Sequence, residues 1–224
     1  MSIKKRDVEQ EFQDLRAAVL AAALPDVPFD GWTETTLMNA AAAAGFERDE
    51  ALRAFPGGRR EAVECYLRMA DERMLAKLAD VDPATLKIRE RITLAVRTRL
   101  EAAEGERDVI LRTLSLLATP AYSKVATRSL YETVNTIWYW AGDTATDFNF
   151  YTKRGLLAGV YTSTLLFWLN DDSPDHAETW AFLDRRIADV MRIPKVTQRF
   201  KKIRQRLPNL GPLLGKLRRR RATG

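Results

Sequence analysis

The sequence predicts an all-α protein. Apolar side chains recur every three or four residues from the first segment onward, as at Val8, Phe12, Leu15 and Val19, which is the spacing of one face of a helix. Proline or glycine separates these amphipathic segments, and no stretch alternates apolar and polar residues as a half-buried strand does. The 224-residue length allows one sizeable core, or a small domain packed on a larger one.

Capping and helix-breaking residues divide the first 80 residues. Pro25, Pro28 and Gly31 interrupt the chain after the first amphipathic segment. Thr33 or Thr35 can cap the next helix, and glycine after its last turn can end it. The expected helices cover about residues 6–23, from Thr33 or Thr35 to Ala44 with Gly45 after it, 49–54 and, beyond the turn at 55–58, 59–78.

Two further helix starts have a capping residue followed by proline. Asp82-Pro83 and Ser173-Pro174 fit this pattern, because proline suits the first helical position. Pro194 is expected to begin a separate segment. The predicted helices of this part cover about residues 82–103, 106–118, 122–141, 150–169 and 173–192.

Composition narrows the class of protein. Hydrophobic residues make up 46% and charged residues 29% of the chain, which is ordinary for a globular protein. The one cysteine, Cys65, leaves no disulfide framework and favours a reducing compartment. The longest apolar run, residues 156–169, contains several polar side chains and is shorter than the ~20 residues that span a membrane, so it is predicted to be a core helix.

The N-terminal segment MSIKKRDVEQEF turns acidic at once. It lacks the apolar stretch of a secretory signal and the acid-poor character of an organelle transit peptide. A location in the bacterial cytoplasm, peripheral on the inner membrane, is therefore expected.

The sequence contains no recognisable catalytic or metal-binding motif. His176 is the only histidine, whereas a di-iron site in a helical bundle uses two Glu-x-x-His pairs. It is expected at a solvated helix start beside Asp175 and Glu178. The segment 55–58 lacks the lysine and the preceding strand of a phosphate-binding loop. We therefore expect a protein that is not an enzyme and needs no metal or other cofactor.

Residues 33–54 have the outline of a helix-turn-helix, with Gly45 at the turn. With the long helix that follows, they resemble the N-terminal domain of TetR-type repressors. Charge argues against DNA binding: residues 1–80 contain eleven Lys and Arg against fifteen Asp and Glu, and the second helix begins Glu47-Arg48-Asp49-Glu50, with three carboxylates. Because DNA readers gain affinity by neutralising phosphates, we expect a structural remnant.

The most distinctive stretch is WYWAGDTATDFNFYTKR, residues 138–154. Together with 157–161, Ser173-Pro174-Asp175 and 179–183, it closely resembles the coenzyme Q biosynthesis family numbered nine. The resemblance is strong over about residues 120–192 and looser over the helix-turn-helix. It implies a TetR-like fold and a non-catalytic accessory protein, which holds an isoprenoid or quinone lipid and acts with the di-iron demethoxyubiquinone hydroxylase.

The resemblance also implies a partner-binding surface within this stretch. Carried over to this chain, its residues are Asp147, Asn149, Phe150, Tyr151 and nearby Arg154. Position 150 is phenylalanine where the family has tryptophan, so an indole N–H contact is missing. Three aromatic residues lie within 148–151 and cannot all face one core, so at least one is expected at the surface. The alternative is that these aromatic residues cap the core.

A candidate lipid pocket follows from helical spacing. Tyr161, Leu165 and Trp168 are four and three residues apart and share one helix face, and Trp138 is a further candidate lining residue. The alternative is that this apolar stripe is ordinary core.

The C-terminal region combines a basic charge with an apolar stripe. Residues 192–224 contain twelve Lys and Arg and no Asp or Glu, so the net charge of +6 conceals an acidic body. These features predict an amphipathic helix that binds an anionic membrane surface, with a nucleic-acid-binding tail as the alternative. The residues expected at the membrane are Val196, Arg199, Phe200, Lys201, Lys202, Ile203, Arg204 and Leu207.

The sequence thus predicts a TetR-repressor-like helical bundle in three parts. Residues 1–80 contain the helix-turn-helix-like region, 81–192 the lipid-binding domain and 193–224 the membrane-binding tail. The expected function is to bind a lipid intermediate of ubiquinone synthesis and present it to the hydroxylase. The alternative is a TetR-type transcriptional regulator with a lipid-like effector. A homodimer through residues 150–192 is expected from the fold analogy.

Overall fold

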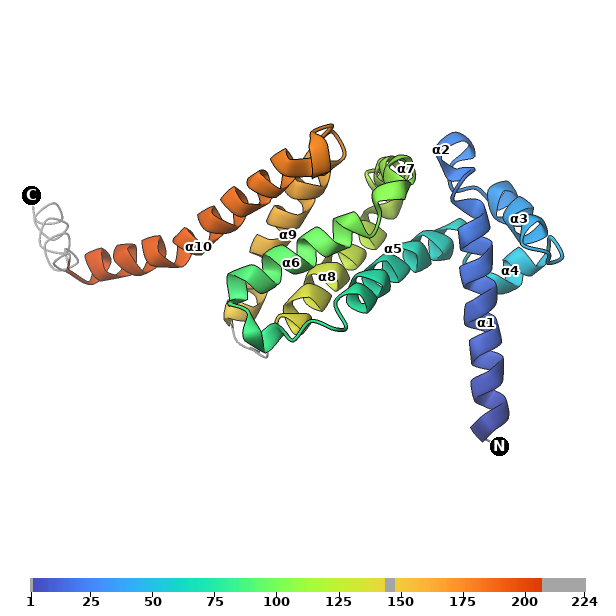
Figure 1. Ribbon diagram of the computed structural model, residues 1–224, viewed down its shortest axis with the longest axis horizontal. Helices are drawn as coiled ribbons and strands as arrows, with labels where there is room; N and C mark the ends of the chain where they lie inside the picture. The colour runs from blue at the N-terminus through green and yellow to red at the C-terminus, as the bar shows by residue number, and fades with distance from the viewer. Residues whose placement is uncertain (1, 144–147, 207–224) are drawn as a thin grey trace, which may run out of the picture. The chain divides into compact units, whose positions relative to one another are not determined.

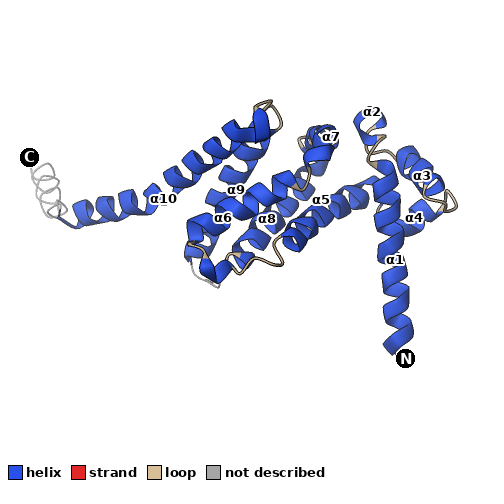
Figure 2. Ribbon diagram, in the orientation of Figure 1, coloured by secondary structure: helices blue, strands red, loops and turns tan. Residues whose placement is uncertain are grey.

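The computed structural model describes residues 2–143 and 148–206, with side-chain exposure within 8–143 and 151–192. Every regular element in the described ranges is a helix (Figures 1 and 2), which confirms the expected all-α fold. Within these ranges, no helix combines the length and the apolar character needed to cross a membrane.

The helices follow one another through short connections. Four of these connections include single turns of 3-10 helix, η1 (Pro83–Thr85), η2 (Glu104–Glu106), η3 (Pro120–Tyr122) and η4 (Pro174–His176). The α-helices are α1 (Ser2–Ala23), α2 (Val27–Asp30), α3 (Glu34–Ala43), α4 (Glu50–Ala54), α5 (Gly58–Lys77), α6 (Ile88–Glu101), α7 (Arg107–Leu117), α8 (Ser123–Trp140), α9 (Phe148–Trp168) and α10 (Ala177–Arg206).

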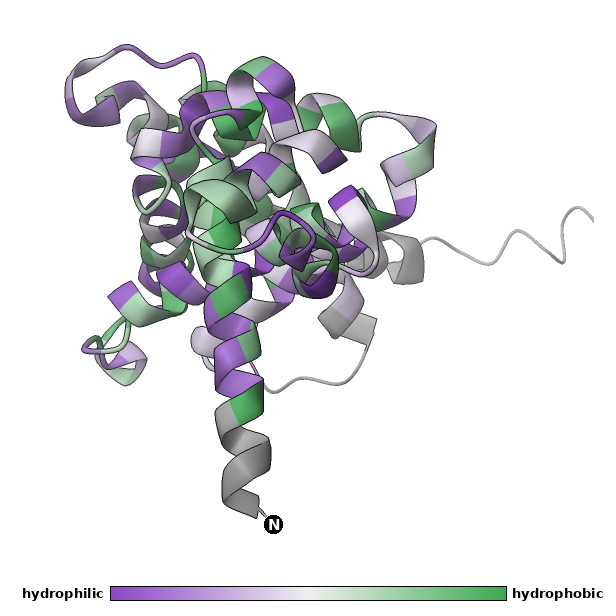
Figure 3. Cartoon of the chain, turned by 90° about the vertical axis from the view of Figure 1, so that its right-hand side faces the viewer, coloured by the Kyte–Doolittle hydropathy of each residue, from purple (hydrophilic) through white to green (hydrophobic). Residues whose placement is uncertain are grey.

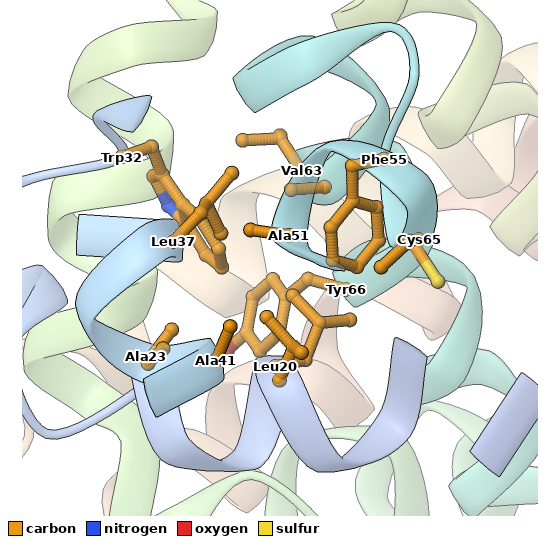
Figure 4. Close-up of a cluster of buried hydrophobic side chains, with 14 of the residues drawn as sticks. Leu20, Ala23, Trp32, Leu37, Ala41, Ala51, Phe55, Val63, Cys65 and Tyr66 are labelled. Atoms are coloured by element: carbon orange, nitrogen blue, oxygen red, sulfur yellow. The ribbon is translucent and has the colours of Figure 1, made fainter. Parts of the chain in front are cut away.

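The helix-turn-helix is α3 and α4, which pack against α1. Thr33 caps α3, because its Oγ1 accepts a 3.0 Å hydrogen bond from the backbone N–H of Thr36. Gly45 follows α3 with φ of 87°, a left-handed conformation that favours glycine. Apolar side chains from α1, α3, α4 and α5 fill the space between them, and Phe55 is fully buried (Figure 4). The expected short helices and their caps are therefore confirmed.

The long helix α5 belongs to two cores. Its first half contributes Val63 and Tyr66 to the N-terminal cluster, whereas Met74, further along, is buried in its second half. Beyond the N-terminal cluster, α5 packs against α6 and α8, and α8 packs against α9 (Figure 1). Figure 3 shows hydrophobic and hydrophilic residues intermixed along the helices, as expected when one face of a helix is buried.

The helix expected from Asp82-Pro83 starts later than predicted. Asp82 does act as a cap, accepting a 2.8 Å hydrogen bond from the N–H of Ala84, but only the single turn η1 follows. The backbone is extended at Leu86, with φ of −106° and ψ of 150°. A second cap then opens α6, where the Glu90 carboxylate accepts a 2.8 Å hydrogen bond from the N–H of Lys87.

The other expected start, at Ser173, also opens only one turn, η4, before α10 begins. Asp175 and His176 both have φ of 53°, so the chain turns within η4, directly before α10 begins. The cap comes from a more distant residue. The Asp171 carboxylate accepts hydrogen bonds from the N–H groups of Ser173, at 2.8 Å, and Thr179, at 2.9 Å.

Helix α10 does not end where the sequence predicted. It continues through Pro194 to Arg206, so the expectation of a separate segment beginning at Pro194 is wrong. Proline removes one backbone hydrogen bond from a helix, and here the helix continues without it. The first residues of α10, up to Leu183, belong to the unit formed by helices α1–α9, whereas Asp184 begins a second unit.

Candidate functional site

The inward face of α9 carries three of the four predicted lipid-lining residues. Tyr161, Leu165 and Trp168 are all buried, with exposed fractions of 7%, 8% and 0%, so their expected common face is confirmed. The guanidinium of Arg107 lies 5.1 Å from the centre of the Trp168 ring and donates to the backbone oxygen of that residue. Trp168 is therefore a tightly held core residue.

Trp138 lies apart from these three residues. It is on α8, half-buried, and its Nε1 donates a 3.3 Å hydrogen bond to the backbone oxygen of Lys153 near the start of α9. The Lys153 ammonium group lies 5.5 Å from the centre of its ring. Trp138 thus joins the ends of α8 and α9 and does not line the same space as Tyr161.

A small cavity lies between α5, α6, α7 and α9. Its volume is about 40 Å³, well below the ~300–1,000 Å³ of pockets that enclose drug-sized ligands. Five aliphatic side chains make up much of its wall, and four residues with a hydroxyl or guanidinium group contribute to it. The lining residues are Tyr66, Leu67, Arg99, Leu100, Ile110, Thr113, Leu114, Tyr161 and Leu165.

Arg99 is the buried charge beside this cavity. Its side chain is 6% exposed, and Nε lies 2.8 Å from Oδ1 of Asp71. The hydroxyl of Thr133 lies 2.9 Å and 3.0 Å from the two oxygens of the same carboxylate. The ion pair therefore connects α5, α6 and α8 and fixes where the guanidinium lies.

A second polar cluster fixes Tyr66. Its hydroxyl donates a 2.8 Å hydrogen bond to Oε2 of Glu106, and Arg73 donates to both oxygens of that carboxylate, with Nη2 at 2.9 Å from Oε2. Burial acts to raise the pKa of Glu106, but these hydrogen bonds outweigh it and hold the pKa below its usual value. Glu106 is therefore a carboxylate at neutral pH.

Sequence analysis missed Arg99, Asp71, Glu106 and Tyr66. A signal for Arg99 was present, because it continues the apolar series of Ile92 and Val96 at spacings of four and three residues. A charged residue on the buried face of a helix indicates a buried partner. Its partner could not be read from spacing, since Asp71 lies 28 residues away.

The predicted partner-binding surface lies at the start of α9. Tyr151 is 69% exposed, and Tyr139 on the neighbouring helix α8 is 60% exposed, so the expected surface aromatic residue is confirmed at Tyr151. Asn149 and Phe150 belong to the first turn of α9, but their side chains lie outside the described residues, as does all of Asp147.

Arg154 does not lie at the surface as expected. Its side chain is 2% exposed; Nη1 lies 3.3 Å from Oδ2 of Asp143, and Nε donates a 2.8 Å hydrogen bond to Asn135. Lys153 completes this cluster at 2.8 Å from Oδ1 of Asp143. A buried guanidinium with these contacts positions the first turns of α9 against α8, and Tyr151 is carried on those turns.

The remaining residues singled out in the sequence lie on α10, before α4 and in η4. The predicted membrane-binding residues 196–206 lie on α10, but their side chains, and all of Leu207, are outside the described residues. Asp49 stands directly before the short helix α4, makes no capping hydrogen bond with its side chain and is exposed, as is Glu47. His176 is not at a solvated helix start: its side chain is 16% exposed and its Nε2 lies 2.9 Å from Oε2 of Glu104.

Comparison with known proteins shows a similarity to COQ9 proteins. The COQ9 family model matches residues 123–194. The chain is 32% identical to ubiquinone biosynthesis protein COQ9, mitochondrial, of Rattus norvegicus over 88% of its own length and 65% of that protein's. The Homo sapiens protein of the same name is also 32% identical, over 88% of this chain and 64% of the relative. The chain is therefore similar to COQ9 proteins over most of its own length.

The COQ9 relatives correct one expectation and support another. Their names support a role in ubiquinone biosynthesis. They are named as mitochondrial proteins, and the matches include a protein of Dictyostelium discoideum that is 29% identical over 81% of this chain and 61% of its own length. The expected bacterial cytoplasmic location is therefore wrong, and the N-terminal residues were a poor guide to it. The chain spans just under two thirds of the length of the mammalian COQ9 proteins.

A solved structure gives the fold of this chain independently. A TetR transcriptional regulator from Nitrosomonas europaea ATCC 19718 superposes with a TM-score of 0.65 and 22% sequence identity, over 80% of this chain and 98% of the regulator. At this identity the likeness shows the fold alone, and it confirms the expected TetR-like arrangement.

Proposed function

We propose that the chain is a non-catalytic accessory protein of ubiquinone biosynthesis. It binds an isoprenoid or quinone intermediate at a membrane surface and presents it to the di-iron demethoxyubiquinone hydroxylase. The observation that carries the proposal is the coincidence of similarity to COQ9 proteins with an apolar-walled cavity inside the helical body, lined in part by the predicted residues Tyr161 and Leu165.

The small cavity sets a condition on lipid binding. A volume of about 40 Å³ holds one small group, whereas an isoprenoid tail needs a pocket of several hundred Å³. The lipid-bound protein must therefore adopt a conformation in which the helices around the cavity move apart. The lipid would shift the protein toward this open conformation, because the lipid binds the open conformation more tightly than the closed one. Leu114 and Ile110 of α7, which line the cavity, would then contact the lipid.

The hydroxylase is proposed to bind the surface around Tyr151. Tyr139 and Tyr151 expose aromatic rings next to the buried cluster of Asp143, Lys153 and Arg154. Exposed aromatic residues on a rigid base suit a protein interface, because they bury a large area with little loss of conformational entropy.

Two further features complete the proposal. The basic residues of the tail, 193–224, attract an anionic membrane surface, where each Lys or Arg contributes roughly 1 kcal/mol before screening.

The outer face of α9 carries Gly155 and Gly159, where an added Cβ would meet no atom within 4 Å, and Leu166 is 51% exposed nearby on the same helix. Such a face allows close approach of a second copy, so we propose a homodimer through it.

Lipid extraction tests the central claim. The full chain would be purified from cells that make ubiquinone, extracted with organic solvent and analysed by mass spectrometry. The expected result is an isoprenoid or quinone lipid in a stoichiometric share, reduced in a Leu165→Arg variant that places a charge in the cavity wall. A matched Leu111→Arg variant changes an exposed leucine and should retain the lipid. Protein that carries no such lipid, or carries it equally in all three forms, would contradict the proposal.

A further inference from the structure

The wall of the small cavity has two kinds of surface. Leu67, Leu100, Ile110, Leu114 and Leu165 give it an apolar side. Arg99 and the hydroxyl-bearing side chains of Tyr66, Tyr161 and Thr113 give it polar groups. An apolar enclosure with a few convergent polar groups is the usual composition of a site that orients a ligand.

The Arg99 guanidinium has N–H donors beyond the one that binds Asp71. A guanidinium carries five N–H donors, and among the described residues its one hydrogen bond to protein runs from Nε to Asp71. The remaining donors belong to a side chain that is 6% exposed and that lines the cavity. Buried donors are normally satisfied, since leaving one without an acceptor costs about 1–3 kcal/mol. The terminal amino groups of Arg99 are therefore available to an acceptor in the cavity.

Tyr161 presents a second available donor. It is 7% exposed and lines the same cavity, and no hydrogen bond of its hydroxyl is found among the described residues. Burial raises the pKa of this phenol, so the hydroxyl keeps its proton at neutral pH. The Tyr66 hydroxyl differs, because its proton is already donated to Glu106.

Both donors are held in place by the fold. The Asp71 carboxylate, fixed by Thr133, holds Arg99 through Nε. Tyr161 lies on α9, one turn from Leu165 and on the same buried face. Donors that are already positioned bind an acceptor without first losing conformational entropy.

We infer that Arg99 and Tyr161 form a subsite that binds a hydrogen-bond-accepting oxygen on the ring of the lipid headgroup. The inference rests on the proposed lipid-binding function and specifies which end of the lipid reaches the cavity. About 40 Å³ is enough for one such oxygen, since a water molecule has a share of about 30 Å³ in the liquid. The guanidinium adds a positive charge, which favours the partial negative charge of a quinone carbonyl. A lipid that lacks a ring oxygen would gain nothing from these donors.

Binding of two matched probes to the full-length chain tests the inference. Decylubiquinone has ring carbonyls, whereas decylbenzene keeps the ring and tail but lacks ring oxygens. Tyr161→Phe removes only the hydroxyl and should weaken decylubiquinone binding roughly three- to tenfold, the latter being about 1.4 kcal/mol. Decylbenzene binding should stay unchanged. Tyr122→Phe removes the hydroxyl of another buried tyrosine, outside the cavity, and should alter neither.

A double variant probes the guanidinium. Asp71→Asn with Arg99→Met removes both charges together, which avoids leaving the buried carboxylate without its partner. It should lose quinone binding by tenfold or more while still binding decylbenzene. Retention of decylbenzene binding also shows that the variant is folded.

The outcomes separate the subsite from the proposed function. If the unaltered chain binds neither probe, the lipid-binding function fails. If it binds both probes equally and Tyr161→Phe changes neither, lipid binding stands and the subsite is refuted. An equal weakening of both probes by Tyr161→Phe would also refute it, because that result reports packing. Tighter, Tyr161-dependent binding of a phosphatidylcholine micelle would assign the donors to a phosphate and overturn the ring-oxygen inference.

Discussion

The hydroxyl of Tyr66 donates a 2.8 Å hydrogen bond to the carboxylate of Glu106. The ring of the same tyrosine lies 5.4 Å from the ring of Trp32, centre to centre, inside the N-terminal cluster. Tyr66 also lines the small cavity. Tyr66 therefore packs in the helix-turn-helix core, lines the cavity and binds Glu106 of η2. A movement of the cavity wall at Tyr66 would also displace its contacts with Trp32 and Glu106.

Replacing Glu106 with glutamine should lower stability in a pH-dependent way. The folded pKa of Glu106 lies below its ordinary value of 4.5, so its contribution is present above that pH and is lost as the pH falls through the folded pKa. At pH 7, Glu106→Gln should lower the free energy of unfolding by about 1–3 kcal/mol. Urea unfolding from pH 7 to pH 3 should show this difference shrinking below about pH 4.5.

A control for this prediction is Glu101→Gln. Glu101 pairs with Arg97 at the surface, with both side chains more than 40% exposed, so its loss should change stability by less than about 1 kcal/mol at any pH. A stability difference for Glu106→Gln that stays constant down to pH 3 would show that its carboxylate has an ordinary pKa.

Tyr151→Ala should weaken binding to the demethoxyubiquinone hydroxylase. Removing an exposed aromatic anchor from an interface commonly costs 2 kcal/mol or more, which is about a thirtyfold increase in Kd. Because Tyr151 is 69% exposed, the melting temperature should stay unchanged. Biolayer interferometry with immobilised hydroxylase measures the change in Kd. The matched control is Tyr131→Ala, because Tyr131 is also an exposed tyrosine but lies on α8. Equal affinities for the two variants would count against this surface.

Deleting residues 194–224 should abolish binding to anionic liposomes. The deletion removes all eleven basic residues of the tail, and with them the electrostatic attraction. Flotation with vesicles containing phosphatidylserine should recover the full chain in the lipid fraction, and recovery should fall with added salt. The truncated chain should remain at the bottom of the gradient. If it floats equally well, another surface binds the membrane.

Gly159→Trp should break the proposed dimer. The substitution places a large side chain on the exposed face of α9, where a Cβ meets no atom of its own chain within 4 Å, so the monomer should fold normally. Gly105→Trp adds the same bulk at another open glycine and should leave the dimer intact. Multi-angle light scattering should then report about 25.5 kDa for the first variant and twice that for the second. A monomeric unaltered chain would remove the basis of the prediction.

Local signals predicted most helices but misplaced two starts. The cap at Thr33 and the glycine at Gly45 act over four residues or fewer, and both are confirmed. Asp82 has an equally good local signal, yet Arg91 of α6 donates to the backbone oxygens of Leu86, at 2.9 Å, and Ala141, at 2.7 Å. These contacts hold Leu86 in its extended conformation, and α6 starts after it.

The candidate site likewise has features that local sequence predicted and features that depend on helix packing. The spacing of Tyr161 and Leu165 predicted a shared buried face, and the run of aromatic residues predicted that one would be exposed. Arg154, which the resemblance placed in the partner-binding surface, has a side chain that is only 2% exposed. Its burial depends on Asp143 and Asn135, which reach it only when α8 and α9 pack together.

The sequence by itself determined the helical class, most helix ends and the separation of an acidic body from a basic tail, because these depend on nearby residues and on composition. Tertiary structure decided which polar side chains are buried together and where a cavity remains. Arg99 shows the physical reason. A charge on the apolar face of α6 is tolerated only because α5 brings Asp71 to 2.8 Å from it. That pairing depends on how the helices pack, and helix periodicity carries no information about it.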